Sequence, residues 1–245
     1  MSVVLPLSRL ARYSHAGMTL AKDDPRINEP LYTFSEAALF LGQRPSTFRE
    51  WARGRGASRP IVTAGEENPG GPVVPFIGLA EGAIAALFKS VRGVSTQYIR
   101  KALTVLQDQM GVGHALASQR LYVHGARLLF EYVQDDETER LVEVVSQNAV
   151  FRPVVQEKLK RITYGKDGWV ARLVLPSTER EIVTVDPFRA AGQPLTVEGG
   201  ARVVDLLARF RGGESPDFIS KDFGVPKKDV LDILRAFYQA APEAA

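Results

Sequence analysis

Two helix-ending glycines close together constrain the fold of this 245-residue chain more than any other feature. Within residues 31–56, one short apolar run ends at Gly42 and a second ends at Gly54. The segment Gln43-Arg44-Pro45 between the runs has the composition of a turn, and glycine commonly follows the last residue of a helix. The pattern predicts two short helices joined by a tight turn, with Ser35 as the N-cap of the first. This arrangement is typical of the helix-turn-helix motif.

The second of these helices has one apolar face and one basic face. Ser46 is its expected N-cap. Phe48 and Trp51 are three residues apart and share the inward face, whereas Arg49 and Arg53 are four apart and share another. An arginine face on the helix after a tight turn favours a recognition helix that lies in the major groove of DNA. The residues predicted to contact DNA are Arg44, Ser46, Thr47, Arg49, Glu50, Arg53, Arg55 and Arg59.

The positive charge of the chain is concentrated at its start. Residues 1–60 hold nine Lys and Arg against five Asp and Glu, whereas residues 181–245 hold eight against ten. An excess of cations is expected where a protein faces phosphate. Residues 1–30 are rich in helix-breaking residues and predict a flexible arm. An arm led by Arg9 and Arg12 that enters a minor groove is the alternative.

A β-hairpin is predicted directly behind the helix pair. The β-prone runs 60–63 and 73–77 flank the turn-rich segment 65–71. In this position a hairpin indicates the wing of a winged helix-turn-helix. Its tip carries Glu66 and Glu67, which argue against close contact with phosphate there.

Further along the chain, hairpins and helices alternate before a regular C-terminal part. Residues 182–187 have the pattern of a strand, and three helices follow, the second with Ser215 as N-cap and Pro216 in its first turn. Residues 175–180 are expected to connect two domains. Helices are also expected at 79–89, 96–110 and 148–159, hairpins at 121–132 and 162–175, and a strand at 141–145. The chain is therefore expected to be α+β and mainly helical. Its expected parts are a flexible arm at 1–30 and a winged helix-turn-helix DNA-binding domain at 31–115. A mixed α/β hairpin region at 116–175 and a C-terminal strand plus tri-helical, helix-turn-helix-like unit at 181–245 follow.

The C-terminal unit is similar to the first helix pair in outline but not in charge. Its expected inward side chains are Val203, Val204, Leu207, Phe210, Val230, Ile233, Leu234, Phe237 and Tyr238. Its charged side chains are Lys221, Lys227, Lys228 and Arg235 against Glu214, Asp217, Asp222, Asp229, Asp232 and Glu243. A surface that neutralises phosphate would hardly carry more acid than base, so this unit is expected to contact protein. Lys227 and Lys228, at the start of its last helix, leave a secondary DNA contact open.

The composition argues against an enzyme and against a metal site. The chain has no cysteine, and His15, His114 and His124 lack the spacing that places two ligands on one helix face. No nucleophile–base pair, glycine-rich phosphate loop or credible carboxylate pair is found, so no catalytic residue and no cofactor is predicted. The acidic run Asp135–Glu137 is interpreted as a solvated loop because no partner motif follows it. Without cysteine, and without an apolar run long enough for a bilayer, the chain is expected to be cytoplasmic with no membrane partner.

The C-terminal part also carries a motif. Its sequence contains Glu181-Ile-Val-Thr-Val-Asp-Pro-Phe, then Gly192-Gln-Pro, Arg202-Val, and Gly213-Glu-Ser-Pro-Asp-Phe-Ile-Ser-Lys-Asp-Phe-Gly-Val-Pro. These residues resemble the strand and tri-helical unit of small bacterial antitoxins, and the whole chain resembles a long VapB-type antitoxin. The resemblance covers residues 181–245 well and the N-terminal part only in architecture. Leu195 and Ala201 depart from the family's pattern, so no contact role is carried over for that loop.

This resemblance implies a cognate PIN-like ribonuclease toxin with an acidic, Mg²⁺-binding site that the antitoxin masks. It also implies repression of the protein's own promoter through operator DNA, with a homodimer inside a toxin–antitoxin hetero-oligomer. A cation is one expected mask for carboxylates, but the toxin-binding surface stays unknown at this point. The candidates are the apolar tail 237–245 and Arg152, Lys158, Lys160, Arg161, Arg172, Arg189 and Arg202. The alternative function is a stand-alone winged-helix transcription regulator whose middle region senses a small ligand, with Trp169 lining the pocket.

Overall fold

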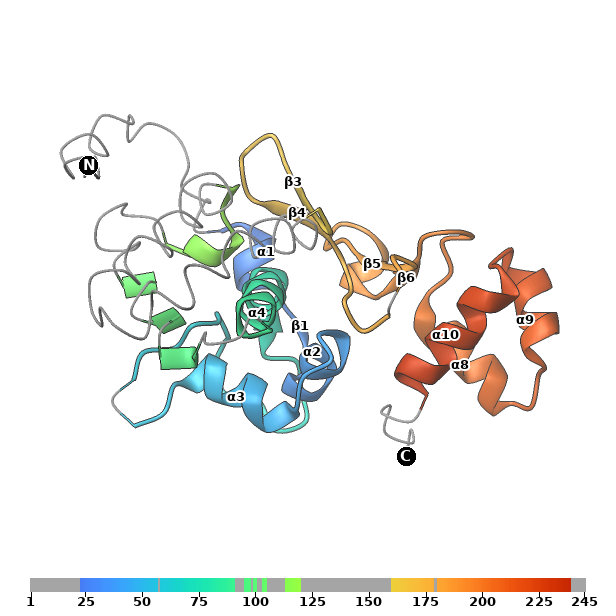
Figure 1. The fold of residues 1–245 in the computed structure, drawn as a ribbon, viewed down its shortest axis with the longest axis horizontal. Coiled ribbons are helices and arrows are strands. Elements are labelled where there is room, and N and C mark those ends of the chain that lie inside the picture. The colour runs from blue at the N-terminus through green and yellow to red at the C-terminus, as the bar shows by residue number, and fades with distance from the viewer. Residues whose placement is uncertain are drawn as a thin grey trace, which may run out of the picture.

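The computed structural model describes residues 23–56, 58–90, 95–97, 99–100, 103–104, 113–119, 160–178 and 180–238. Within these ranges the protein is mixed α+β, as predicted, and its strands form two small antiparallel sheets. A helical body, a strand layer and a C-terminal helical unit follow one another along the longest axis (Figure 1). The helices are α1 (Pro25–Asn28), α2 (Phe34–Phe40), α3 (Pro45–Arg53), α4 (Phe76–Lys89), α8 (Val203–Arg211), α9 (Pro216–Phe223) and α10 (Lys227–Phe237), with the short 3-10 helices η2 (Ala115–Ala117) and η4 (Ala190–Gly192). The strands are β1 (Pro30–Tyr32), β2 (Val74–Pro75), β3 (Ile162–Tyr164), β4 (Val170–Val174), β5 (Val183–Val185) and β6 (Leu195–Thr196).

Helix α2, the first helix of the predicted pair, begins earlier than the sequence suggests. Thr33 is its N-cap, and its hydroxyl accepts a hydrogen bond from the amide of Glu36 at 3.1 Å. The Glu36 carboxylate accepts from the amide of Thr33 at 2.8 Å in return. This reciprocal capping box satisfies two free amides at once, whereas the predicted cap, Ser35, lies inside the helix.

Helix α3, the second of the pair, is confirmed with its apolar face inward and with a different start. Arg44 is the N-cap and makes no side-chain cap hydrogen bond, and Pro45 takes the first helical position. Proline suits that position because its φ is fixed and it has no amide to satisfy. The prediction of Ser46 as N-cap is therefore wrong. Phe48 and Trp51 are both buried, as their spacing predicts.

The hairpin predicted behind the helix pair is not formed, so the described residues contain no wing. Strand β2 lies in one of the two predicted runs but pairs antiparallel with β1, with Tyr32 opposite Val74. The other run, 60–63, forms no strand, and the amide of Ile61 instead donates to the carbonyl of Trp51 at 2.8 Å. The two segments meet only where the amide of Gly65 donates to the carbonyl of Val73 at 2.7 Å, while the amide of Val73 donates to the carbonyl of Tyr32 at 2.9 Å.

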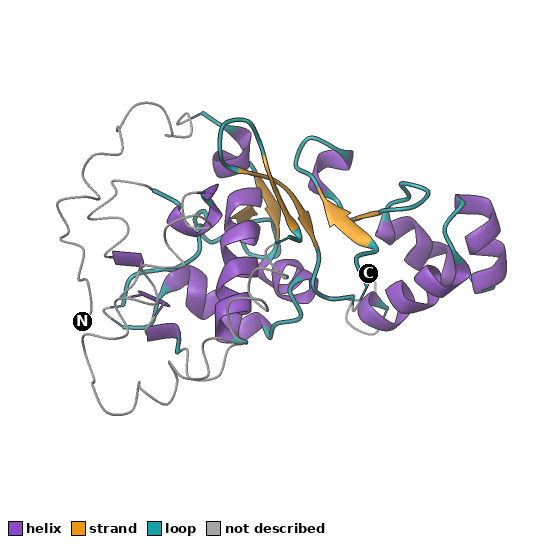
Figure 2. Ribbon diagram, turned by 45° about the horizontal axis from the view of Figure 1, so that its top comes forward, coloured by secondary structure: helices purple, strands orange, loops and turns teal. Residues whose placement is uncertain are grey.

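Four strands form an antiparallel sheet in the order β3-β4-β5-β6, between the helical body and the C-terminal helices (Figure 2). The predicted hairpin at 162–175 is confirmed as β3 and β4, with Ile162 opposite Leu173. Strand β4 then pairs with β5, with Leu173 opposite Val185. Residues 175–180, predicted to connect two domains, therefore lie between two paired strands of one sheet. The domain boundaries themselves remain predictions.

The three predicted C-terminal helices are confirmed as α8, α9 and α10. The hydroxyl of Ser215 caps α9 by accepting from the amide of Phe218 at 3.3 Å, and Pro216 takes the first helical position. Most of the predicted inward side chains are buried. Val204 and Tyr238 are exceptions, at 47% and 39% exposed. Val204 follows the buried Val203 and Tyr238 follows the buried Phe237, and one residue along a helix turns a side chain by about 100°. Phe210 is half-buried.

Two aromatic contacts join the helical body to the C-terminal half. The Tyr32 hydroxyl donates to the carbonyl of Gly192 at 2.9 Å, and burial raises the pKa of Tyr32. In α2 the ring of Phe40 meets Phe237 of α10 edge-on, with 6.2 Å between ring centroids. The two halves therefore pack as one body in this region.

An ion-pair cluster joins α1 to the β3–β4 turn. Arg26 is buried, and its guanidinium contacts the carboxylates of both Asp24 and Asp167. The hydrogen bond to Asp24 is the main cause that raises the pKa of Arg26. Arg26 lowers the pKa of the Asp24 carboxyl. Burial raises the pKa of Asp167, but hydrogen bonds from Arg26 and the Trp169 amide outweigh it, so that pKa is lowered too.

Several predicted elements lie outside the described residues. They are the arm up to residue 22 with Arg9 and Arg12, the hairpin 121–132, the acidic run Asp135–Glu137, the strand 141–145, and the helix 148–159 with Arg152 and Lys158. The helix predicted at 96–110 is described only in part. In the part of the chain that is described, no helix has the length and apolar composition needed to cross a membrane.

A buried acid–histidine pair supports the segment that follows α3. The side chain of Glu81 in α4 is 5% exposed, and its carboxylate accepts from the amide of Thr63 at 2.6 Å. Its other oxygen lies 3.1 Å from Nδ1 of His114. Burial lowers the pKa of His114, but the hydrogen bond and the negative charge of Glu81 outweigh it, so the pKa lies above the ordinary 6.5. The protonated histidine therefore stabilises the folded state.

We expect His114→Asn to destabilise the protein more at acidic than at alkaline pH. Because the folded pKa exceeds the unfolded one, the stabilisation is complete below about pH 6.5 and is lost as pH rises through the folded pKa. Asparagine tolerates the left-handed backbone at this position, where φ is 55°. Urea unfolding followed by tryptophan fluorescence should give a difference of about 1–3 kcal/mol near pH 6 that shrinks towards pH 8.5. A difference that stays constant with pH contradicts the pairing.

Candidate nucleic-acid interface

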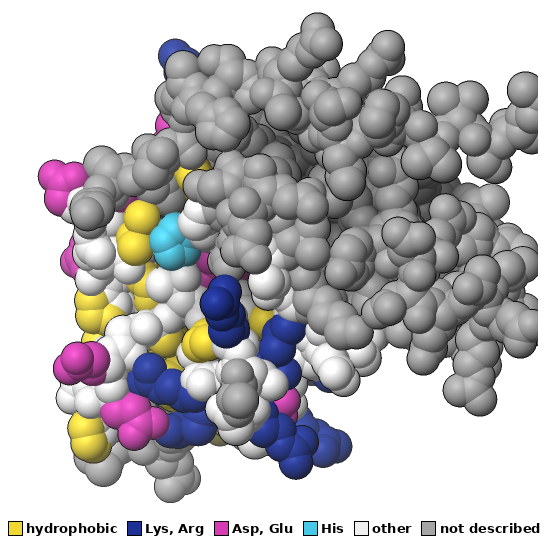
Figure 3. Space-filling view, turned by 90° about the vertical axis from the view of Figure 1, so that its left-hand side faces the viewer, with side chains coloured by type: hydrophobic (Ala, Val, Ile, Leu, Met, Phe, Trp, Pro, Cys, Tyr) yellow, Lys and Arg dark blue, Asp and Glu magenta, His cyan; other side chains and the backbone are white. Residues whose placement is uncertain are grey.

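Helix α3 presents its polar side on the surface of the helical body. Phe48 and Trp51 are buried beneath it, whereas Ser46, Arg49 and Arg53 are exposed. Lys and Arg side chains gather at one end of the described surface, with acidic side chains among them (Figure 3). An α-helix with its side chains is about 10–12 Å in diameter, and the major groove is about 12 Å wide. The helix therefore offers a fixed, exposed face of suitable size for that groove.

The two arginines of this face lie over one aromatic ring. The guanidinium carbon of Arg49 is 4.9 Å from the ring centroid of Phe34, and that of Arg53 is 5.3 Å from it. Cations are attracted to the face of an aromatic ring at such distances. We call Arg49 and Arg53 the arginine pair. Phe34, the first residue of α2, thus holds the arginine pair side by side.

An acid from the loop after α3 completes this arrangement. Glu67 Oε1 lies 2.8 Å from Nη1 of Arg49 and 3.9 Å from Nε of Arg53. Arg53 Nη1 also donates to the carbonyl of Gly65 at 2.8 Å. The side chains of Arg49 and Glu67 are 58% and 63% exposed, so their ion pair adds little to stability. An incoming anion can replace Glu67 at small cost.

Glu50, one of the predicted DNA contacts, is half-exposed and contacts another side chain of the protein. Its carboxylate lies 3.7 Å from Nη2 of Arg100, and Nε of Arg100 donates to the carbonyl of Arg59 at 3.1 Å. The chain turns back after α3 at Gly54, where φ is +78° and a Cβ would lie 2.0 Å from the carbonyl oxygen of Ser58. Only glycine fits this turn. Glu50 and Gly54 therefore hold the loop after α3 rather than reach outward.

Three further predicted arginines flank α3, and their guanidinium groups are free to bind an anion. Arg44 precedes the helix, Arg55 and Arg59 follow it, and all three are exposed. Across the described ranges, no ion pair or hydrogen bond is found for these three guanidinium groups. Exposed guanidinium groups form strong, charge-assisted hydrogen bonds with phosphate oxygens. All eight predicted residues thus lie at the surface or half-exposed around one helix. Glu50 differs from the other seven because Arg100 contacts its carboxylate.

The C-terminal unit differs because acids engage several of its cations. Nζ of Lys227, a predicted secondary DNA contact, lies 2.7 Å from the Asp217 carboxylate. Arg209 pairs with Asp222 at 3.0 Å. Lys228 is exposed. Residues 181–245 hold ten Asp and Glu against eight Lys and Arg, so the surface around Lys227 is less suited to phosphate than the surface around α3.

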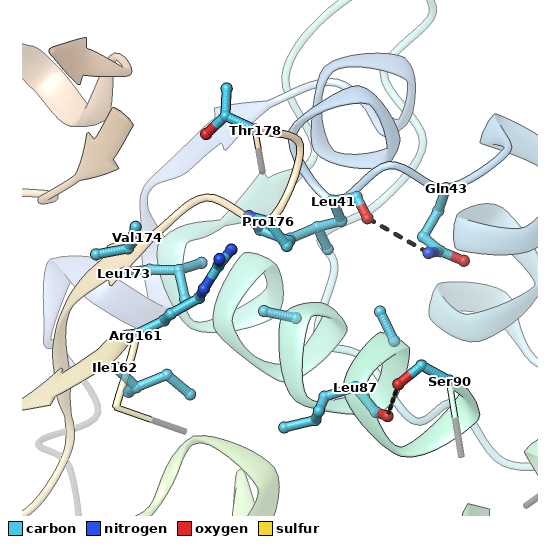
Figure 4. Close-up of a pocket in the computed structure, with 12 residues that line it drawn as sticks. Leu41, Gln43, Leu87, Ser90, Arg161, Ile162, Leu173, Val174, Pro176 and Thr178 are labelled. Carbon is cyan, nitrogen blue, oxygen red and sulfur yellow. Dashed lines mark hydrogen bonds between the residues drawn. The ribbon is translucent and has the colours of Figure 1, made fainter. Parts of the chain in front are cut away.

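A cavity of about 320 Å³ lies between α4, the turn after α2 and the β3–β4 hairpin. Its walls are mostly apolar, and the side chain of Arg161 points towards its centre (Figure 4). Trp169, expected to line a pocket in a ligand-sensing regulator, is 2% exposed and does not line this cavity. Its ring instead packs edge-on against His114 at 6.5 Å. No group of three acidic or histidine side chains among the described residues is arranged to hold a metal ion.

Three side chains that shape this interface have no local signal in the sequence. Phe34 has the pattern of a core residue, and only the fold brings the arginine pair over its ring. Glu67 is visible as an acid in a turn, but its approach to α3 depends on how the loop returns. Arg100 is distant in sequence from both Glu50 and Arg59.

Comparison with known proteins agrees with this geometry. Residues 30–103 match the protein family described as "Putative DNA-binding HTH domain". Over 229 residues the chain is 33% identical to a Mycobacterium tuberculosis protein named "Putative antitoxin VapB45", covering 86% of this chain and 95% of that protein. It is also similar to the crystal structure of Rv2018 from Mycobacterium tuberculosis, with a TM-score of 0.71 and 30% identity over 85% of this chain and 99% of that one. With such identity across most of both chains, this protein belongs to the VapB family of antitoxins and carries a helix-turn-helix domain of the DNA-binding type.

Proposed function

We propose that this protein binds and inhibits a PIN-like ribonuclease toxin and represses its own operator as a homodimer. The observation that carries the DNA half is the set of exposed arginines on and around α3. Membership of the VapB family supports the toxin half. The α3 surface faces operator DNA, and the more acidic C-terminal half faces protein.

Phosphate contacts and base contacts are divided between two sets of side chains. The unpaired arginines at the two ends of α3 bind phosphates and set the orientation of the helix. The arginine pair offers bidentate donors that suit guanine, and Ser46 and Thr47 in the first turn of α3 reach neighbouring base edges. In a homodimer, two α3 helices read half-sites separated by one turn of DNA.

Glu67 limits this binding because it occupies the arginine pair in the free protein. Phosphate or a base edge must displace its carboxylate before Arg49 and Arg53 are free to bind. Breaking the exposed Arg49–Glu67 ion pair costs little free energy. The stronger contacts of the correct DNA sequence therefore displace Glu67, whereas weaker non-specific contacts displace it less readily. Glu67 thus favours specificity over raw affinity.

Arg49→Ala/Arg53→Ala is expected to weaken operator binding at least about tenfold and to flatten its salt dependence, because contacts with bases and phosphates are both lost. Affinity is measured by fluorescence anisotropy at several salt concentrations, with DNA from upstream of the gene. Arg235→Ala is the control, since it removes an exposed cation from α10, away from α3. Binding that is unchanged by the double substitution rules out α3 as the recognition helix.

Glu67→Gln is expected to tighten binding to unrelated DNA about fivefold, because the arginine pair loses its competing acid. Glu66→Gln makes the same charge change one residue away, and no contact of Glu66 with the arginine pair is found in the described part of the chain. Operator and scrambled duplexes are compared for both variants. Equal effects of the two substitutions would mean that net charge alone, and not contact with the arginine pair, sets the affinity.

The product of the adjacent gene is expected to stop growth when expressed alone and to be harmless when this protein is co-expressed. The Arg49→Ala/Arg53→Ala chain should rescue growth equally well, because the α3 surface is not the surface assigned to the toxin. Growth curves after induction measure both results. An adjacent product that is harmless by itself would falsify the toxin half of the proposal.

A further inference from the structure

The loop between β5 and β6 has an unusual backbone. Ala190, Ala191 and Gly192 follow one another with φ of 47°, 50° and 74°, all in the left-handed region. Glycine adopts this region freely, whereas alanine does so at a cost because its Cβ approaches a carbonyl oxygen. Two successive alanines in this conformation persist only where surrounding contacts hold them, and such strain concentrates in functional loops.

Hydrogen bonds at both ends of the loop hold this conformation. The Asp186 carboxylate accepts from the amide of Phe188 at 2.9 Å, and its backbone carbonyl accepts from the amide of Arg189 at 3.1 Å. The amide of Gly192 donates to the Arg189 carbonyl at 2.9 Å. Its own carbonyl accepts from the buried Tyr32 hydroxyl. These hydrogen bonds therefore hold the loop in one conformation.

The loop presents an aromatic ring and a cation to solvent. Phe188 is 67% exposed, the highest value for a large hydrophobic side chain in the described chain. Arg189 beside it is exposed, and no partner of its guanidinium is found within the described ranges. Aromatic and arginine side chains carry much of the energy at protein–protein interfaces. The exposed large hydrophobic side chains of the described chain all lie in its C-terminal half: Phe188, Val197, Val204, Phe218 and Tyr238.

We propose that the loop 186–193 is the anchor by which this protein holds its protein partner. Phe188 fills an apolar hollow in the partner, and Arg189 pairs with carboxylates at the rim of that hollow. The partner is therefore a protein with carboxylates beside an apolar hollow, and this assignment rests on the proposed function in taking it to be the toxin. A nucleic acid is disfavoured at this loop because residues 181–245 hold eight Lys and Arg against ten Asp and Glu.

Substitutions at the tip of the loop test the anchor. The partner is the purified product of the adjacent gene, and its affinity for the full-length chain is measured by titration calorimetry. Phe188→Ser and Arg189→Ala should each weaken binding about thirtyfold, a loss typical of interface hot spots. Arg189→Ala should also reduce the salt dependence of binding. Phe218→Ser is the matched control, because this ring is 56% exposed in the same half of the protein, and it should bind as the unchanged chain does.

A second variant tests the effect of the loop's conformation on partner affinity separately from its effect on stability. In Ala190→Gly/Ala191→Gly the left-handed backbone is relieved, so the thermal unfolding midpoint should not fall. Affinity for the partner should nevertheless drop about tenfold, because a more flexible loop must be ordered on binding.

The possible outcomes distinguish the anchor from the proposed function. Unchanged affinity in all three loop variants overturns the anchor and leaves the proposed function standing. An equal loss in Phe218→Ser also overturns it, because the exposed apolar surface as a whole would then hold the partner. If the unchanged chain neither binds nor neutralises the adjacent product, the proposed function fails and the anchor fails with it.

Discussion

The side chain of Tyr32 joins the two halves of this protein. Its hydroxyl reaches the carbonyl of Gly192, and its ring packs edge-on against Phe40 at 5.7 Å between centroids. Phe40 in turn meets Phe237 of α10. A buried hydroxyl without a partner is costly, so the loop that supplies the Gly192 carbonyl and the strand that carries Tyr32 fix one another's positions. The surface around α3 and the loop 186–193 therefore belong to one packed body, and neither is a free appendage.

Features that depend on neighbouring residues could be predicted from the sequence. The two faces of α3 follow from the positions of Phe48, Trp51 and the arginine pair along one helix. The β3–β4 hairpin follows from two β-prone runs around a glycine-containing turn, and the start of α9 follows from Ser215 and Pro216. In each case the signal and the structure lie within a few residues of one another. The N-cap of a helix is harder to predict. Thr33 and Ser35 are both suitable N-cap residues for α2, and only the reciprocal hydrogen bonds between Thr33 and Glu36 decide between them.

Features that depend on distant pairing could not be predicted in this way. Strand β2 has the pattern of a hairpin partner for the run behind α3, yet it pairs with β1, which lies on the far side of the helix pair in sequence. The connection at 175–180 has the composition of a linker, and only the pairing of β4 with β5 places it inside a sheet. The same limit applies to the interface. The arginine pair is evident from spacing, whereas its contacts with Phe34 and Glu67 arise only once the loop returns to α3.

Cations in the two halves of the protein differ in the burial of the acids that they contact. Around α3 the arginines are exposed and either unpaired or paired with the exposed Glu67, so a polyanion replaces the existing contact at little cost in stability. In the C-terminal half, Arg180 is paired with Asp232 and with Asp229, which is 5% exposed. Withdrawing that arginine would leave a buried carboxylate without a counter-ion, which is strongly unfavourable. The first set of cations is thus available to phosphate, whereas Arg180 is committed to the fold. The arginine pair and Arg180 therefore differ in the exposure of the acids that they contact, because Glu67 is exposed whereas Asp229 is buried.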